Sequence, residues 1–182
     1  MSISGVILAA GQGTRMKSSL PKVLHNVLGI PMIVYAQEAI SHFDNKYVVV
    51  GHQSEKVSST LSETFIPVEQ KEQLGTGHAI STLLESSEFN SDQSQYLVVI
   101  PGDVPLIRKK DIDKLVNDVV ESNAAIGLIS ANVQNPFGYG RIVKNNEEFE
   151  KIIEESDASE TEKLINEINS GIYCIDINFL NS

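Results

Sequence analysis

The stretch GVILAAGQGTRM, residues 5–16, decides how this chain folds. Its first half, from Gly5 to Ala10, is a continuous apolar run, which is typical of a central strand covered on both faces. The run ends abruptly in a Gly-x-Gly turn at Gly11 and Gly13. Such a turn brings backbone N–H groups to the carboxyl end of a buried strand, the edge of an open α/β sheet at which ligands bind.

Two cationic side chains, Arg15 and Lys22, follow this turn. Positive charge beside free backbone N–H groups suits a polyphosphate. The loop is neither a Walker A sequence nor a dinucleotide fingerprint, because it lacks the Gly-Lys-Ser/Thr of the first and the third glycine of the second. A structural strand–helix turn is the alternative. With both cations present, we interpret the loop as the phosphate-binding loop of a nucleotide enzyme.

Strands and helices are predicted to alternate through most of the chain. Helical spacing of apolar residues separates short β-branched runs, and this pattern predicts an α/β fold with a mostly parallel sheet and right-handed crossovers. The predicted strands are residues 5–10, 47–50, 65–68, 96–100 and 124–133, and the predicted helices begin near residues 31, 54, 76 and 110.

The pattern changes after Val133. Residues 141–144 and 149–153 flank Asn145-Asn146 in the manner of a β-hairpin. Residues 157–167 are highly charged, and we expect them to be helical. A last strand is predicted at residues 171–177.

Composition and charge limit which kinds of function this chain can have. The 182 residues carry a formal charge of −10, with a pI near 4.8, which argues against a nucleic-acid-binding role. No run approaches the roughly 20 apolar residues that span a bilayer, so we expect a cytoplasmic protein without a membrane partner. The single cysteine, Cys174, lies in an apolar run and is predicted to be a buried structural thiol.

Asp103 follows the apolar run 96–100 and therefore falls at the same sheet edge as the first turn. A carboxylate there is costly unless it is solvated, paired or bound to a metal. Mg²⁺ needs only one or two carboxylates beside substrate phosphates, so Asp103 is a candidate ligand. The alternative is an aspartate that stabilises the turn before Val104-Pro105. The four histidines share no ligand spacing, and His78 is expected to be structural.

Six motifs together resemble the N-terminal uridylyltransferase (pyrophosphorylase) domain of the bacterial bifunctional N-acetylglucosamine-1-phosphate uridyltransferase/glucosamine-1-phosphate acetyltransferase. The resemblance covers essentially the whole chain. The motifs are LAAGQGTRM (residues 8–16), LPKVLH (20–25), EQLGTGHA (72–79), GDVPL (102–106), GYGRI (138–142) and EINSGI (167–172).

The resemblance implies a single Rossmann-like nucleotidyltransferase domain over residues 1–182, with helices on both faces of the sheet. Its nucleotide-binding half would span about residues 1–110, and a sugar-phosphate-binding half, containing the hairpin, about residues 111–182. The implied reaction is Mg²⁺-dependent attack of N-acetylglucosamine 1-phosphate on the α-phosphorus of UTP, which gives UDP-N-acetylglucosamine and pyrophosphate for cell-wall and lipopolysaccharide precursors.

The resemblance also implies a role for particular residues. Arg15 would bind the β- and γ-phosphates, and Lys22 would bind the phosphates at the reacting centre. Asp103 would ligate Mg²⁺. The residues implied around the uridine are Leu8, Ala9, Ala10, Gly11, Gln70, Gly75 and Thr76, and those implied around the N-acetylglucosamine are Gly140, Glu154 and Asn169.

Members of this family continue well past 182 residues. The sequence given stops before the downstream asparagine that completes their Mg²⁺ site and before the acetyltransferase domain. We therefore expect no acetyl transfer from this chain and leave its oligomeric state open. Two other hypotheses for the function of the chain remain open. It could be a relative that uses another sugar phosphate or base, as in the molybdenum-cofactor nucleotidyltransferases, or a nucleotide-binding fragment with little activity.

Overall fold

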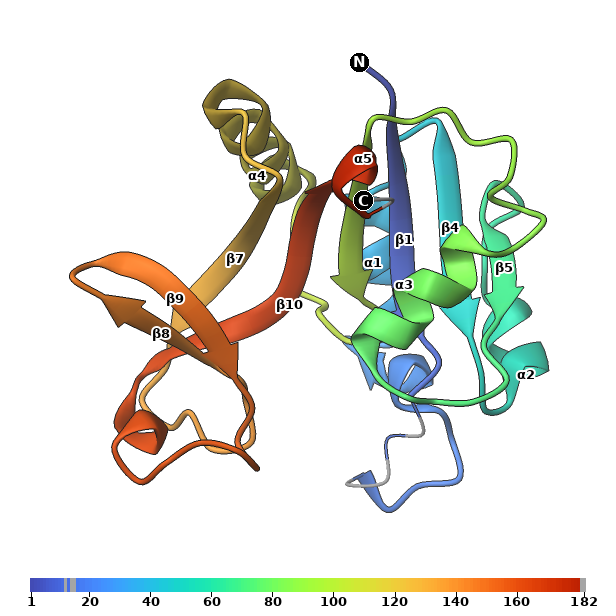
Figure 1. The fold of residues 1–182 in the computed structure, drawn as a ribbon. Coiled ribbons are helices and arrows are strands. Elements are labelled where there is room, and N and C mark those ends of the chain that lie inside the picture. The colour runs from blue at the N-terminus through green and yellow to red at the C-terminus, as the bar shows by residue number, and fades with distance from the viewer. Residues whose placement is uncertain (12, 14–15, 181–182) are drawn as a thin grey trace. The chain divides into compact units, whose positions relative to one another are not determined.

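The structure is a computed structural model that describes residues 1–11, 13 and 16–180 (Figure 1). It divides into two compact units: residues 1–127 with the chain from Tyr173 onward, and residues 128–172. The elements of the described residues, in chain order, are β1 (Ile3–Ala9), η2 (Lys22–Leu24), β2 (Asn26–Val27), β3 (Ile30–Pro31), α1 (Met32–Ala39), β4 (Asn45–Val50), α2 (Ser54–Ser58), β5 (Ile66–Glu69), α3 (Thr76–Leu84), β6 (Tyr96–Pro101), α4 (Lys109–Ser122), β7 (Ile126–Asn132), β8 (Arg141–Asn145), β9 (Glu148–Ile153), η3 (Glu162–Leu164), β10 (Glu167–Asp176) and α5 (Ile177–Leu180).

A parallel sheet forms the centre of the first unit. Its strands lie in the order β5, β4, β1, β6, and each is parallel to its neighbours. Residues 173–176 of β10 then pair antiparallel with β6. Parallel neighbours require long crossover connections, which the helices supply. The predicted α/β fold with a mostly parallel sheet is confirmed.

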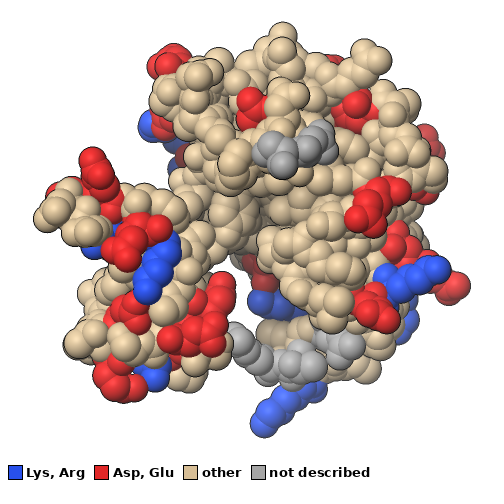
Figure 2. Space-filling view, in the orientation of Figure 1, with Lys and Arg blue, Asp and Glu red and all other residues tan. Residues whose placement is uncertain are grey.

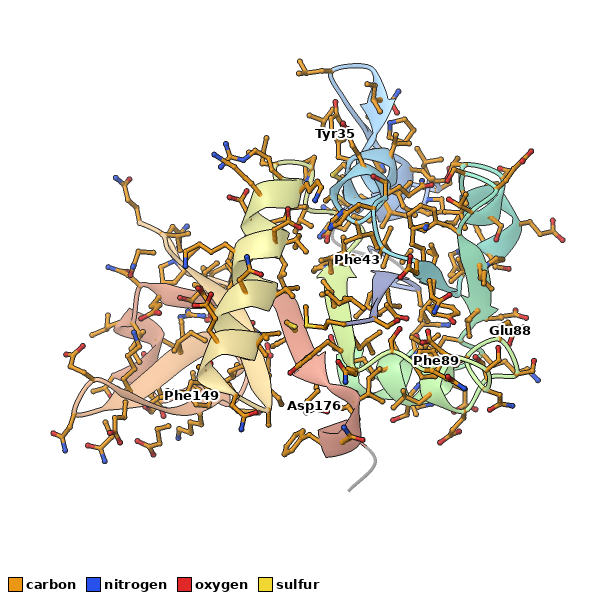
Figure 3. All side chains as sticks on the ribbon, turned by 90° about the horizontal axis from the view of Figure 1, so that it is seen from above. Tyr35, Phe43, Glu88, Phe89, Phe149 and Asp176 are labelled. Atoms are coloured by element: carbon orange, nitrogen blue, oxygen red, sulfur yellow. The ribbon has the colours of Figure 1, made fainter. Side chains whose placement is uncertain are left out.

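Helices cover both faces of this sheet. Figure 1 shows α1 behind the sheet and α3 in front of it. Because side chains alternate along a strand, Val6, Val49 and Val99 form one cluster with the buried side of α3. The buried rings of Phe43 and Phe89 mark the two layers, with Phe43 near α1 and Phe89 near α3 (Figure 3).

Gly5 allows α1 to pack closely on β1. A Cβ atom at Gly5 would lie 2.7 Å from Cδ1 of Ile40 and 2.9 Å from Cδ2 of Phe43. Both neighbours are buried, so neither can move away without opening the core. The glycine at the start of the first motif therefore has a packing role in addition to the turn that follows.

Cys174 lies on β10 and is fully buried. Burial raises the pKa of its thiol to about 12, so the nucleophilic thiolate is scarce at neutral pH. The predicted structural thiol is confirmed.

Surface charge agrees with the acidic composition. On the face seen in Figure 2, acidic side chains are spread widely, and no broad basic patch is seen among the residues that are drawn in colour. Among the described helices, none is long and apolar enough to cross a membrane.

The second unit contains the predicted hairpin, formed by β8 and β9. Asn146 and Glu147 connect the strands with φ of 50° and 66°. Two successive left-handed residues are the pattern of a two-residue hairpin turn whose twist matches that of the strands. Ile168 of β10 pairs with Arg141 of β8 and extends this small sheet.

The helix predicted over residues 157–167 is wrong. Only the short 3-10 turn η3 is helical there, and Glu167 already begins β10. Ser159 and Glu162 bond each other locally, since Oε2 of Glu162 accepts from N and Oγ of Ser159 at 2.9 Å and 2.6 Å. Such local bonds compete with a longer helix. The segment also buries little apolar surface, because Leu164 is exposed and Ala158 is the one buried residue between 157 and 167.

Candidate active site

The first turn opens into a hollow at the carboxyl edge of the first unit's sheet. Because β1 and β6 are parallel neighbours with Leu8 opposite Pro101, their carboxyl ends meet at one edge, as the sequence predicts. The hollow has a volume of about 410 Å³. Its lining residues are Leu8, Ala9, Gly11, Gly13, Met16, Lys22, Val23 and Asp103.

Lys22 and Asp103 form an ion pair across this hollow. Their side chains are 45% and 24% exposed, so both remain accessible to a ligand. Gly13 sits directly over the lysine, with φ of +60°, and a Cβ there would lie 2.7 Å from Cβ of Lys22. The second glycine of the turn is therefore needed both for its left-handed backbone and for the close approach to Lys22. Arg15, the other predicted phosphate-binding cation, lies outside the described residues.

A second hollow, of about 330 Å³, adjoins the first, since Leu8 and Gly11 line both. The remaining residues that line it are Ala10, Gln70, Gln73, Gly75, Thr76 and Ala79. The seven residues that the resemblance implies around a uridine thus lie along these two connected hollows of one unit.

The carboxyl end of β5 and the start of α3 hold this second hollow in shape. The backbone N–H of Gln70 donates to the carbonyl of Val50 at 2.7 Å and so continues the pairing of β5 with β4. Gly75 precedes α3 with φ of 104°, a conformation open to glycine but strained for other residues. Gly75 and Thr76 line the second hollow together with Gly11, at the helix end whose first N–H groups have no partner within the helix.

Gln73, which lines this hollow, and His78, which contacts one of its lining residues, were not predicted to be functional. Gln73 lines it and belongs to the EQLGTGHA motif, so the motif itself could have indicated it. His78, expected to be structural, contacts Gln70, with Nδ1 of the ring 2.7 Å from Nε2 of the amide. No sequence pattern predicts contact between Gln70, just after β5, and His78, in the first turn of α3. The sequence therefore carries no sign of this contact.

The residues implied to bind the sugar lie together in the second unit. The N–H of Asn169 donates to the carbonyl of Gly140 at 2.9 Å. A Cβ at Gly140 would lie 3.1 Å from Oε1 of Glu154, so the carboxylate is next to the glycine backbone.

An ion pair between a buried arginine and a partly exposed glutamate supports this cluster. Arg141 is 1% exposed, and its Nη2 donates to Oε2 of Glu155 at 2.6 Å. The same carboxylate oxygen accepts from the N–H of Gly138 at 3.0 Å. The guanidinium of Arg141 and this N–H hold the pKa of Glu155 below its ordinary value. The loop that carries Gly140 is therefore fixed at both ends.

Asp103 is the one metal candidate from the sequence, and its setting fits a cation shared with a substrate. Among the described residues, no group of three or more His, Cys, Asp or Glu side chains could hold a metal without help. Mg²⁺ is commonly held by one or two carboxylates together with phosphate oxygens. A partly exposed carboxylate that lines the same hollow as the glycine-rich turn and Lys22 has this chemistry.

A glycine-rich turn, a lysine and a carboxylate at the carboxyl edge of a parallel sheet suit a nucleotide-binding α/β protein, and a matching family model narrows this class to the nucleotidyltransferases. Residues 5–164 match the family model of the MobA-like NTP transferase domain, and the chain belongs to this family.

Solved structures share the fold. A UDP-glucose pyrophosphorylase in complex with UDP-glucose superposes with a TM-score of 0.74 at 19% identity, over 100% of this chain and 78% of that one. HddC from Yersinia pseudotuberculosis gives a TM-score of 0.72 at 20% identity, over 96% of this chain and 77% of that one. At such low identity the likeness concerns the fold alone.

Curated relatives are closer in sequence. The bifunctional protein GlmU of Desulfitobacterium hafniense is 41% identical over 176 residues, 96% of this chain and 38% of the relative. That of Oceanobacillus iheyensis is 45% identical over 174 residues, 94% of this chain and 38% of the relative. The chain thus spans 38% of the length of these relatives. The resemblance predicted from the motifs is confirmed.

Proposed function

We propose that this chain is a Mg²⁺-dependent uridylyltransferase that makes UDP-N-acetylglucosamine and pyrophosphate from UTP and N-acetylglucosamine 1-phosphate. The observation that carries the proposal is the pair of connected hollows in the first unit, one with a lysine and a carboxylate, the other with an amide and a helix start. Identity of 41% and 45% to proteins named bifunctional GlmU supports the choice of substrates.

The second hollow is the proposed uridine subsite. The side-chain amide of Gln70 has both a donor and an acceptor end, as has the polar edge of uracil. Backbone N–H groups at Gly75 and Thr76 add donors that no side-chain substitution removes. The nucleoside would lie along residues 8–11 (Leu8, Ala9, Ala10 and Gly11) and extend toward the first hollow.

The first hollow is the proposed triphosphate subsite. Lys22 would leave Asp103 for the phosphate oxygens at the reacting centre, and Arg15 would bind the β- and γ-phosphates. Asp103 would then be free to hold Mg²⁺ together with the phosphates. The bound cation would supply charge neutralisation on the triphosphate and the leaving pyrophosphate.

The proposed chemistry needs no general base. An anionic oxygen of the sugar 1-phosphate attacks the α-phosphorus, a new P–O bond forms in line, and the bond between the α-phosphorus and the bridging oxygen to the β-phosphate breaks. Pyrophosphate leaves with the bond's electron pair. Because the nucleophile is already ionised, catalysis consists of alignment and charge stabilisation by Lys22 and Arg15.

The cluster in the second unit is the proposed sugar subsite. The carboxylate of Glu154 would accept from sugar hydroxyl groups, while Asn169 and the backbone of Gly140 would contact the acetamido group. These groups can both accept and donate, as a neutral, hydroxyl-rich ligand requires.

Pyrophosphate release by the purified chain tests the proposal. We expect pyrophosphate release to be faster with UTP and N-acetylglucosamine 1-phosphate than with any of the other three nucleoside triphosphates. We also expect it to be faster than with UTP and other sugar phosphates. Equal rates with GTP would remove the uridine assignment and favour a relative that uses another base. Tight UTP binding without turnover would favour a nucleotide-binding fragment.

A further inference from the structure

The amide of Gln70 is held in one orientation by a single neighbour. Gln70 is 3% exposed, and its Nε2 lies 2.7 Å from Nδ1 of His78. Gln73, which is also close, donates from Nε2 to the backbone carbonyl of Gln70 at 3.1 Å. His78 therefore decides which end of the Gln70 amide points away from it.

The chemistry of the two groups gives each a role in this contact. In the orientation that the structure gives, the amide Nε2 of Gln70, which can only donate, faces Nδ1 of His78, which can accept. His78 lies in the first turn of the nine-residue helix α3. The contact therefore joins the end of β5 to the start of α3.

The orientation leaves the oxygen of the amide available for a ligand. Oε1 of Gln70 has no hydrogen-bond donor among the described residues, whereas Nε2 is engaged by His78. Gln70 also lines the second hollow. An amide whose nitrogen gives one N–H to the protein offers a ligand its oxygen as an acceptor and keeps only its second N–H as a donor.

We propose that His78 is a positioning residue that makes this site select uracil over cytosine. The inference rests on the proposed function, in which the second hollow receives a pyrimidine. Uracil has an N3–H donor that Oε1 of Gln70 accepts. Cytosine carries a lone pair at N3, which Oε1 repels. If the amide were free to turn over, its NH₂ group would face the base and pair with cytosine instead.

The test compares UTP with CTP in matched variants. His78→Leu removes the acceptor at Nδ1, and His78→Asn restores an acceptor at nearly the same place in its Oδ1. Ser81→Leu, an exposed position on the same helix, is the control. For each variant, kcat/KM for both nucleotides and equilibrium binding of UTP and CTP are measured, with thermal unfolding to verify the fold.

We expect His78→Leu to lower the UTP/CTP ratio by about tenfold, the scale of one lost and one newly made hydrogen bond. His78→Asn should recover most of the ratio, and Ser81→Leu should leave it unchanged. In a Gln70→Leu background, His78→Leu should change the ratio no further, because His78 acts through Gln70.

The inference and the proposed function fail in different ways. A wild-type chain that prefers UTP, with the same preference in a folded His78→Leu variant, would overturn the role of His78 alone. Equal effects of His78→Leu on UTP and CTP would also overturn it, because they indicate a structural role. Absence of UTP turnover in the wild type would contradict the proposed function, and the binding ratio would still decide the role of His78.

Discussion

Replacement of Lys22 by methionine separates a catalytic lysine from a structural one. The ion pair of Lys22 with Asp103 involves side chains that are 45% and 24% exposed. Solvent screens pairs of this kind, and they contribute about 0–1 kcal/mol to stability. Loss of one preorganised contact to developing transition-state charge costs far more, about 10²–10³ in kcat. Lys22→Met should therefore leave the free energy of unfolding within about 1 kcal/mol of wild type and reduce turnover at least ~10²-fold.

Lys109 provides the matched control. Its Nζ lies 2.8 Å from Oδ2 of Asp113, with exposures of 54% and 40%, and the pair belongs to the same unit as Lys22 but lines neither hollow of the candidate site. Lys109→Met should change neither stability nor turnover appreciably. Urea unfolding and pyrophosphate release measure the two quantities. Turnover of Lys22→Met within tenfold of wild type, or equal losses in both lysine variants, would refute the assignment of Lys22 to the reacting centre.

Four other changes have expected outcomes. Asp103→Asn should abolish Mg²⁺-dependent turnover with an unchanged unfolding curve; activity that still rises with Mg²⁺ would remove Asp103 as a ligand. Gly5→Ala should lower the free energy of unfolding by about 1–3 kcal/mol through overpacking against Ile40, as urea titration would show. Arg141 holds the pKa of Glu155 below its ordinary 4.5, so the stability that this carboxylate contributes is complete above pH 4.5 and is lost as the pH falls through the lowered pKa. Glu155→Gln should therefore flatten the pH dependence of the free energy of unfolding in this acid range. Cys174 should resist a thiol reagent at pH 8 until the chain is unfolded, since burial raises its pKa to about 12.

Local patterns predicted the architecture well because the central strands and the longer helices bury apolar residues that their own sequences mark. The apolar run from Gly5 to Ala10 becomes β1, and the Asn-rich break between two short β runs becomes the β8–β9 hairpin turn. Residues 157–167 show the limit of such patterns. Their charge and length resemble a surface helix, but local bonds of Ser159 compete with the helix, and little apolar surface is buried, since Leu164 is exposed.

The sequence predicted individual residues of the candidate site better than the contacts between them. Sheet topology alone indicates that Asp103 shares an edge with the first turn, since both follow parallel strands. It does not indicate that Asp103 pairs with Lys22, which depends on a close turn at Gly13. The resemblance, not spacing, singled out Gln70, and the contact of its amide with His78 emerges only once β5 and α3 are folded together.

An isotope experiment tests the central proposal most directly. N-acetylglucosamine 1-phosphate labelled with ¹⁸O in its non-bridging phosphate oxygens is incubated with UTP, Mg²⁺ and the wild-type chain, and the products are analysed by ³¹P NMR and mass spectrometry. Attack on the α-phosphorus predicts UDP-N-acetylglucosamine with the label retained, one ¹⁸O now bridging the two phosphates, and unlabelled pyrophosphate. Labelled pyrophosphate, or no UDP-sugar at all from a folded chain that binds UTP, would contradict it.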